Sequence, residues 1–156
     1  MSRRRKTIER EILPDPKFNS VKLSKFINTV MQRGKKSLAE QIVYGALDII
    51  EDKTKENGLD IFNQALANVK PVIKVVSRRI GGSNYQIPTE VTSKNAQALA
   101  FRWIISFSRK RSEKTMIERL AGELLAAYKK EGSSIKKRED THKMAEANKA
   151  FAHFRF

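Results

Sequence analysis

Residues 72–91, VIKVVSRRIGGSNYQIPTEV, interrupt a chain whose apolar residues otherwise recur at helical spacing. Both arms of this stretch contain β-branched residues, which favour strands, and its centre holds Gly81 and Gly82. Glycine adopts a positive φ without steric cost, so this pair suits a tight reversal of the chain. The stretch therefore predicts a β-hairpin in an otherwise helical protein.

Three side chains beside the predicted tip have two interpretations each. Arg78 and Arg79 either protect an exposed strand edge from pairing with other strands or bind phosphate. Tyr85 either covers Ile80 across the turn or faces a nucleic-acid base. The hairpin sequence alone leaves both alternatives open.

Two amphipathic helices are predicted near the N-terminus. The first starts near Ser20 and stops near Gly34, because apolar residues recur there at i, i+3, i+4 and i+7. Ser37 is expected to cap the second helix, with Glu40 completing a capping box. The buried face of that helix is expected to begin at Leu38.

Three further helices complete the predicted bundle. One starts between residues 57 and 60 and ends before Pro71. The next follows a cap at Thr92 or Ser93, and the fifth covers 115–128 with a stop at Gly132. The helix after the hairpin is expected to bury an apolar stripe made of Ala96, Leu99, Ala100, Trp103, Ile104 and Phe107.

The last segment, 134–148, has a helix-favouring composition but few apolar positions. We expect such a helix to be loosely attached or ordered by a partner, because its own burial is small. Residues 151–156 combine aromatic rings with cations, which suits stacking on bases or packing into a groove of a partner.

Together these elements predict a mainly α fold, a helical bundle of five to six helices with one protruding β-hairpin and a basic N-terminal arm. We expect the arm at 1–17, where Pro14 and Pro16 disfavour helix. The helical core domain is expected at 18–131, with the hairpin at 72–91 inside it. A basic C-terminal helix and tail are expected at 132–156.

The charge of the chain points to a polyanionic partner. It contains 32 Lys plus Arg and 17 Asp plus Glu, a net charge of +15. Residues 1–36 hold 11 bases and 3 acids, 37–75 hold 4 and 6, and 76–156 hold 17 and 8. Clustered bases displace counterions from nucleic acid, which gives salt-sensitive binding. A membrane surface is the rival polyanion, but we expect no membrane partner, because no stretch approaches the ~18 apolar residues of a spanning helix.

Several function classes find no support in the residues. The chain has no cysteine, and His142 and His153 are too far apart to share one helix face, so we expect no metal site. The acidic residues are interspersed with bases at helical spacing, and Gly81-Gly82 lacks the Lys-Ser/Thr of a phosphate loop. We therefore expect no enzyme, no cofactor and no small-molecule substrate. The basic 3–6 cluster is followed by Glu9 where a signal peptide needs apolar residues, so we expect a cytoplasmic protein.

Ordered blocks along the whole chain resemble the bacterial small-subunit ribosomal protein S seven family. The blocks are DPKF at 15–18, GKKSLAE at 34–40, SRRIGG at 77–82, YQIP at 85–88, ALAFRWI at 98–104 and KKRED at 136–140 continuing to MAEANKAFAH at 144–153. The resemblance implies a helical bundle with a protruding β-hairpin. It also implies a structural protein that binds the 3′ (head) domain of small-subunit rRNA, nucleates head assembly and lies near the tRNA exit site. Exit-site tRNA and neighbouring head and platform ribosomal proteins are the further partners that it implies.

Carried over residue by residue, the resemblance implies rRNA contacts in the arm, the turn before the second helix, the hairpin and the chain after the fourth helix. These residues are Arg3, Arg4, Arg5, Lys6, Arg10, Lys35, Lys36, Arg78, Arg79, Arg109 and Arg111. Lys94 partly replaces a basic pair that the family often has where this chain has Asn95-Ala96. Arg102 and Lys110 add positive charge toward the C-terminal end of the helix predicted after the hairpin. They complete the expected rRNA-binding set. The residues expected near tRNA are Gly81, Gly82, Ser83, Asn84, Tyr85, Lys136, Lys137, Arg138, Lys143 and Lys149.

Two alternatives compete with an rRNA-binding protein. A DNA-binding helix-turn-helix protein would use Gly34-Lys35-Lys36 as its turn, although the helix that follows is acidic on its exposed face. A protein-interaction adaptor would dock a partner on the near-neutral middle of the chain.

Overall fold

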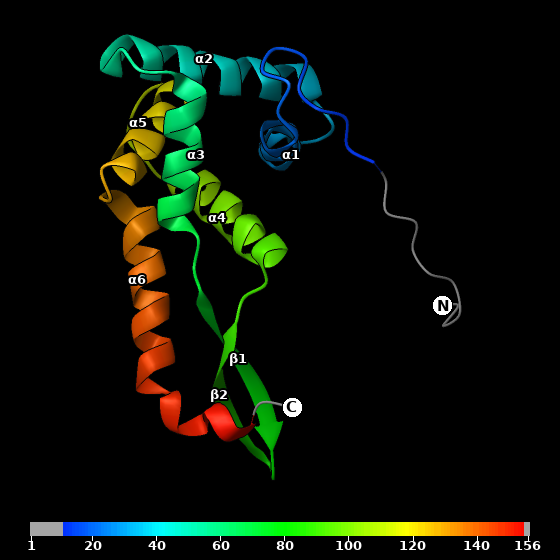
Figure 1. The fold of residues 1–156 in the computed structure, drawn as a ribbon, viewed down its shortest axis with the longest axis vertical. Helices are drawn as coiled ribbons and strands as arrows, with labels where there is room; N and C mark the ends of the chain where they lie inside the picture. Colours follow the sequence, from blue (N-terminus) through cyan, green and yellow to red (C-terminus); the bar gives the residue numbers. More distant parts are fainter. Residues whose placement is uncertain (1–10, 155–156) are drawn as a thin grey trace.

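The computed structural model describes residues 11–154 (Figure 1). Arg3, Arg4, Arg5, Lys6 and Arg10 lie outside the described residues, and so do Arg155 and Phe156. Within the described part the chain forms six α-helices, one antiparallel hairpin and a terminal 3-10 helix. The mainly α fold with a protruding hairpin is thereby confirmed.

The described part of the chain contains one sheet, the two-stranded antiparallel hairpin. They are α1 (Val21–Val30), α2 (Lys36–Thr54), α3 (Gly58–Val69), β1 (Ile73–Ile80), β2 (Ser83–Glu90), α4 (Ser93–Ser108), α5 (Met116–Tyr128), α6 (Gly132–Ala147) and η1 (Lys149–Phe154).

Helices α1 to α5 pack around one apolar core. The Phe26 ring of α1 contacts the rings of Phe62 from α3 and Phe101 from α4, with centroids 5.1 and 5.2 Å away. Leu47 of α2 and Leu120 of α5 are fully buried in the same cluster. Burial of a large apolar side chain stabilises a fold by about 1.5–3 kcal/mol, so this cluster holds the bundle together.

The starts of three helices follow their capping residues. Ser20 Oγ accepts the Leu23 backbone N–H, and Asn57 Oδ1 accepts the Leu59 N–H, at donor–acceptor distances of 3.4 and 2.9 Å. Thr115 and Glu118 form a reciprocal capping box at the start of α5. Each device satisfies an N–H group that the first helical turn leaves without a partner.

The predictions at the α1–α2 junction were wrong in detail. Helix α1 ends at Val30 rather than near Gly34, because Met31 already has an extended backbone. Helix α2 starts at Lys36, one residue before Ser37, and its N-cap residue makes no side-chain capping bond. Ser37 therefore lies inside the helix, where its hydroxyl cannot act as the cap. Leu38 is 49% exposed, because the turn places Ala39 and Val43 on the buried side instead.

The buried face of α4 is rotated from the predicted stripe. Half of the predicted stripe is buried, namely Ala96, Ala100 and Ile104, but Leu99, Trp103 and Phe107 are only partly buried. Phe101, Ile105 and Ser108 are buried in their place. The reason is that α4 contacts α1, α3, α5 and α6, so its environment is wider than one stripe. Helix α5 ends at Tyr128 as predicted, but Gly132, with a φ of 88°, begins α6 instead of stopping α5.

The hairpin forms with a two-residue turn. Ile80 pairs with Ser83, which leaves Gly81 and Gly82 as the turn, with φ values of 57° and 89°. Positive φ at both central residues is the geometry of the tight hairpin turn that glycine favours. The hairpin prediction is confirmed, and Figure 1 shows the strands running away from the helical core beside α6.

Helix α6 is docked by Ile135, which is buried in the core cluster, and by polar contacts that its sparse apolar pattern did not predict. The Ser134 N–H donates to Glu123 of α5 at 3.1 Å. The Arg138 guanidinium donates to the Asn68 carbonyl of α3, and His142 Nε2 accepts the Val72 N–H at 3.1 Å. The expectation of a helix without firm attachment overlooked these contacts, because polar docking leaves no apolar periodicity in a sequence.

Candidate nucleic-acid interface

The first of two basic grooves lies between α1 and α4. Its cationic residues are Lys25 on α1 and Lys94 and Arg102 on α4, and amides from both helices lie between them. None of the described residues that line it is acidic. The groove encloses about 430 Å³, and its lining is Ile12, Lys25, Asn28, Thr29, Lys94, Gln97, Ala98, Phe101 and Arg102.

The second groove lies at the α1–α2 turn and reaches the loop after α4. Arg33, Lys35 and Arg109 supply its positive charge, and no lining residue in the described part of the chain carries a carboxylate. Arg109 is held at the rim, because its Nη2 donates to the Val30 carbonyl at 3.4 Å. The groove encloses about 420 Å³, and the remainder of its lining is apolar apart from Gln32 and includes Met31, Leu38 and Met116.

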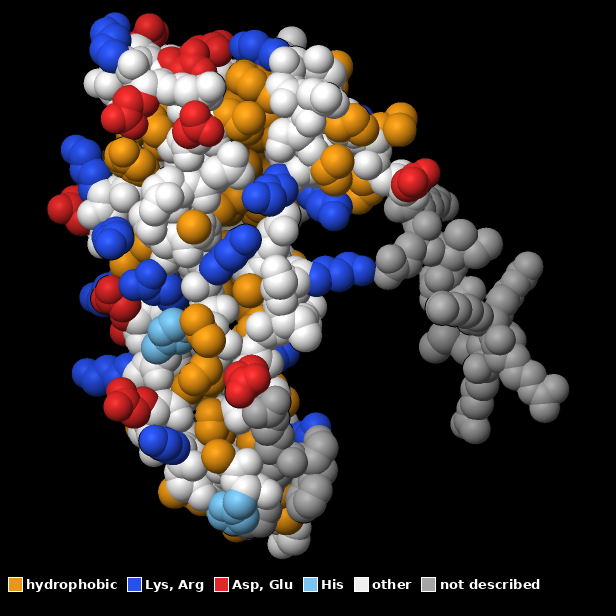
Figure 2. Space-filling view, viewed as in Figure 1, with side chains coloured by type: hydrophobic (Ala, Val, Ile, Leu, Met, Phe, Trp, Pro, Cys, Tyr) orange, Lys and Arg blue, Asp and Glu red, His pale blue; other side chains and the backbone are white. Residues whose placement is uncertain are grey.

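Helix α1 thus borders two basic grooves, one against α4 and one at its C-terminal end, and among the described residues each contains three cations and no acid. Concave surfaces lined by one sign of charge concentrate counter-charged ligands. Several acidic side chains gather instead over the part of the core where α2 and α3 meet, at the top of Figure 2, where Asp52, Glu56 and Asp60 are exposed. The arrangement can bind a phosphodiester backbone around α1 and disfavours it at the α2–α3 end.

The structure brings together four of the basic residues predicted from the sequence. Lys35 and Arg109 line the second groove, and Lys94 and Arg102 line the first. Lys36 is exposed beside them, with its Nζ 3.8 Å from Glu40. Lys110 is exposed, and its Nζ lies 5.7 Å from the centroid of the Phe107 ring.

Sequence reasoning missed Lys25 and Arg33. The signal for Lys25 was its place in α1, one residue before the buried Phe26 and away from the apolar face. Arg33 precedes Gly34 in the α1–α2 turn and has a positive φ of 52°. A turn that projects from the bundle exposes every charged side chain that it carries, so Arg33 belonged with Lys35 and Lys36.

Arg111 differs from the other predicted contacts. Its Nε donates to Glu113 at 2.8 Å, and its Nη1 donates to the buried Glu123 at 3.2 Å. The hydrogen bond to Glu113 is the main reason that the pKa of Arg111 is raised. The structure therefore places Arg111 in an internal ion-pair network, and its charge is already compensated within the protein.

Comparison with known proteins gives a match over nearly the entire chain. The family model described as Ribosomal protein S7p/S5e matches residues 2–149. The chain belongs to the ribosomal protein S7p/S5e family. It is therefore a ribosomal protein, and its role is structural rather than enzymatic.

Full-length relatives agree with this membership. The chain is 62% identical to the small ribosomal subunit protein uS7 of Rhodospirillum centenum, 59% to that of Syntrophobacter fumaroxidans and 58% to that of Marinobacter nauticus. Each comparison covers 156 residues, all of this chain and all of the relative.

The hairpin of this S7p/S5e protein exposes both of its arginines. Arg78 lies opposite Tyr85 in the register and Arg79 opposite Asn84. Tyr85 packs edge-on against Phe151 of η1, with ring centroids 5.4 Å apart. Neither predicted alternative for Tyr85, covering Ile80 across the turn or facing a base, includes this contact, because Phe151 is distant in the sequence.

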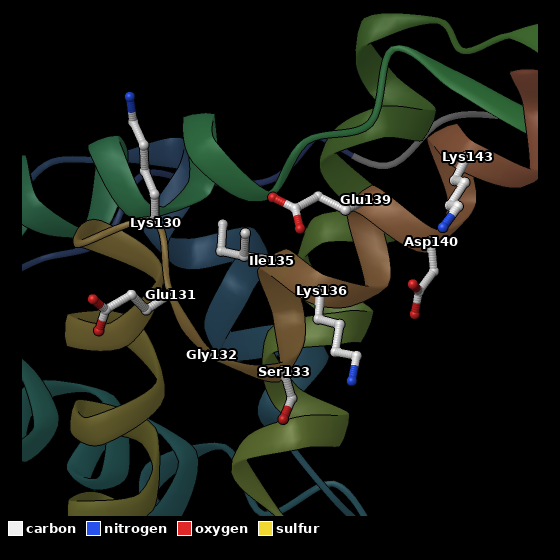
Figure 3. A pocket seen from close by; sticks show the side chains of 9 residues that line it. All are labelled: Lys130, Glu131, Gly132, Ser133, Ile135, Lys136, Glu139, Asp140 and Lys143. Atoms are coloured by element: carbon white, nitrogen blue, oxygen red, sulfur yellow. The ribbon is translucent and has the colours of Figure 1, made fainter.

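The basic residues of α6 and of the start of η1 fall into two groups. Lys136, Lys143 and Lys149 are exposed and Lys137 is half-buried, whereas Arg138 is turned inward to Asn68 and to Glu139. At the α5–α6 corner, a shallow depression of about 760 Å³ contains three lysines and three carboxylates. Lys130 and Lys136 extend in opposite directions in Figure 3, so the positive charges do not converge on one anion.

The base of the N-terminal arm is fixed by a buried carboxylate. Asp15 is 3% exposed and accepts the backbone N–H groups of Lys17 and Phe18 and the hydroxyl of Tyr44. Burial, together with the hydrogen bond to Asp15, raises the pKa of Tyr44. This anchor joins the end of the arm to α2, next to the basic surface around α1.

Neither a membrane span nor a metal site is found between residues 11 and 154. None of the helices in that range is both long and apolar enough to cross a membrane. No group of three or more His, Asp and Glu side chains in the same range has the arrangement of a metal site.

Proposed function

We propose that this protein, as a structural constituent of the small ribosomal subunit, binds the 3′ domain of its rRNA through the two grooves beside α1. The observation that carries the proposal is the charge of the groove linings, since the described residues of each include three cations and no acid. Family membership makes ribosomal RNA the polyanion that such a surface would meet. Binding is then driven by phosphate neutralisation and release of counterions.

The shape of the surface favours folded RNA over a DNA duplex. A helix-turn-helix protein inserts a second helix with basic residues into the major groove. Helix α2 follows the α1–α2 turn, but its exposed residues include Asp52, which would repel phosphate, and Asp48, which already pairs with Lys17. Two basic grooves that border one helix instead suit the backbone of an RNA junction, which proteins recognise largely by shape.

The hairpin and α6 have a second role in the proposal. Gly81 to Asn84 are exposed at the end of the hairpin, which projects from the core. Exposed lysines lie along α6 and at the start of η1. These exposed residues would allow the hairpin and α6 to contact exit-site tRNA and neighbouring head and platform proteins. The protein would nucleate assembly of the subunit head in the cytoplasm, with its basic arm on rRNA.

A competition experiment tests rRNA binding. A fragment of the small-subunit rRNA 3′ domain should displace a labelled RNA copy at far lower concentration than duplex DNA does, at matched salt. The Lys25→Ala/Arg33→Ala/Arg109→Ala variant should bind at least tenfold more weakly, because it removes cations from both grooves. The matched control, Lys53→Ala/Lys55→Ala/Lys129→Ala, removes three exposed lysines outside them. Equal displacement by DNA, or equal losses in the two variants, would contradict the proposal.

A further inference from the structure

The hairpin rests on one part of the molecule. Among the described elements, its strands contact α6 and η1, and they contact none of the helices α1 to α5. A two-stranded hairpin is marginally stable on its own, so it needs support to hold a fixed direction. We call the supporting segment, α6 and η1, the C-terminal brace.

The first support lies at the base of the hairpin. The Val72 N–H, just before β1, donates to Nε2 of His142 on α6 at 3.1 Å. The Nε2 atom can accept this bond only when it carries no proton, which places the proton of the neutral ring on Nδ1. One turn earlier on α6, Arg138 donates to the carbonyl of Asn68, near the end of α3. These two contacts fix α6 beside the chain that enters the hairpin.

The second support lies closer to the tip. Tyr85 of β2 is half-buried and meets Phe151 of η1 with an interplanar angle of 60°, a favourable edge-to-face geometry. Ile87 lies two residues further along, on the same face of the strand, and is 2% exposed. Ile87 and Ala145 of α6 are both buried, yet neither belongs to the apolar cluster of the core. The hairpin and the brace also line one shared depression with apolar residues, Ile73 and Pro88 from the hairpin and Ala145 and Ala152 from the brace.

We propose that His142 and Phe151 are positioning residues, which fix the direction of the hairpin so that Gly81 to Asn84 meet RNA in a preorganised state. His142 acts at the base and Phe151 near the tip, so together they restrict both tilt and bending. Preorganisation matters because conformational entropy that the hairpin loses on binding reduces affinity. The identity of the ligand as RNA rests on the proposed function, whereas the positioning itself does not.

A distance measurement on the free protein tests the brace. The chain has no cysteine, so spin labels at Ser83→Cys and Asp52→Cys, both exposed positions, report one distance between tip and core. Phe151→Ala combined with His142→Phe should broaden the distance distribution about twofold, because the hairpin has little rigidity of its own. Thermal unfolding of the helical core should be nearly unchanged.

Matched variants separate positioning from general loosening. Met144→Ala changes an exposed residue on α6 and should leave the distribution narrow. Phe151→Tyr keeps the aromatic edge, and His142→Gln offers an oxygen to the Val72 N–H. A variant with these two substitutions in place of Phe151→Ala and His142→Phe should have a distance distribution nearly as narrow as that of the wild type. A double variant as narrow as the wild type would overturn the proposal, and so would equal broadening by Met144→Ala.

A second readout connects position to binding. An iron chelate attached at the tip through the Ser83→Cys substitution should cleave RNA at a few sites in subunits reconstituted with the otherwise unchanged chain. Adding Phe151→Ala/His142→Phe should make the cleavage sites more dispersed. Identical focused cleavage in both would overturn the positioning role. Absence of RNA cleavage without the added substitutions would contradict the role proposed for the hairpin on RNA, while the distance distribution would still decide whether the brace exists.

Discussion

The helical core and the projecting unit, which we define as the hairpin and its C-terminal brace, are held together by different interactions. In the core, Phe26, Phe62 and Phe101 pack against one another inside a continuous apolar cluster. In the projecting unit, single contacts such as Val72 with His142 and Tyr85 with Phe151 hold the elements. The difference teaches that burial stabilises the bundle, whereas a few specific contacts set the direction of the part that extends from it.

The largest effect is expected from a cavity in the core. Phe26→Ala should lower the free energy of unfolding by about 3–5 kcal/mol, because Phe26 is fully buried between two other rings. Ile87→Ala removes an equally buried side chain from the projecting unit and should change global unfolding much less, since the core remains packed. Urea titrations of both variants measure the contrast, and similar losses would show that the two regions unfold as one.

The next effect concerns the joint between the two regions. Glu123 is 1% exposed, and it accepts hydrogen bonds from Arg111 of the loop after α4 and from Ser134 at the start of α6. Glu123→Ala should cost about 2–3 kcal/mol, because it leaves the buried Ser134 N–H without its partner and the partly exposed Arg111 less well compensated.

Glu123→Gln is the control, since it retains an oxygen for Ser134 and should cost less than the alanine variant. Chemical denaturation measures both losses, and hydrogen exchange should show increased exchange in α6 for Glu123→Ala alone. Unchanged exchange there would mean that this carboxylate does not join α6 to the core.

A smaller effect is expected on RNA binding. Arg109 and Arg111 are two residues apart, but of the two only Arg109 lines a basic groove. Arg109→Ala should reduce the slope of log Kd against log salt by about 0.7–0.9 for the phosphate contact that it loses. Arg111→Ala should lower stability and leave the salt slope nearly unchanged. Salt titrations with the rRNA 3′ domain fragment measure both slopes. A larger change of slope for Arg111→Ala than for Arg109→Ala would place the phosphate contact on Arg111 instead.

The smallest effect is on acid stability. The hydrogen bond from Arg111 lowers the pKa of Glu113 below its value in the unfolded chain. The resulting stabilisation is complete above the unfolded-state pKa and is lost as the pH falls through the folded-state pKa. Glu113→Gln should therefore be slightly less stable at neutral pH, and the difference from the wild type should disappear at acidic pH. Urea midpoints across a pH series measure this, and a difference that grows on acidification would contradict it.

The core could be predicted from the sequence because its physical cause repeats along the chain. Apolar residues at helical spacing indicated five helices, and Gly81-Gly82 between β-branched stretches indicated the hairpin. The buried face of α4 was predicted only in part, at Ala96, Ala100 and Ile104, because the sequence does not say that four helices surround this one.

The candidate site was less predictable for a different reason. Lys35, Lys94, Arg102 and Arg109 were found from charge and family resemblance, but their division between two grooves depends on where α1 lies. Arg111 has the same residue type and nearly the same position in the chain as Arg109, yet a buried glutamate twelve residues later binds it. Long-range polar pairs of this kind, like His142 with Val72, leave no local signal in a sequence.

Hydrogen exchange on the free protein tests the contrast between the two regions most directly. Amides of α1 to α5 should exchange through global unfolding, with protection that tracks the free energy of unfolding. Amides of β1, β2 and the C-terminal half of α6 should exchange faster through local opening and should gain protection when the rRNA 3′ domain fragment and tRNA are bound. Equal protection of core and projecting unit in the free protein would contradict the account.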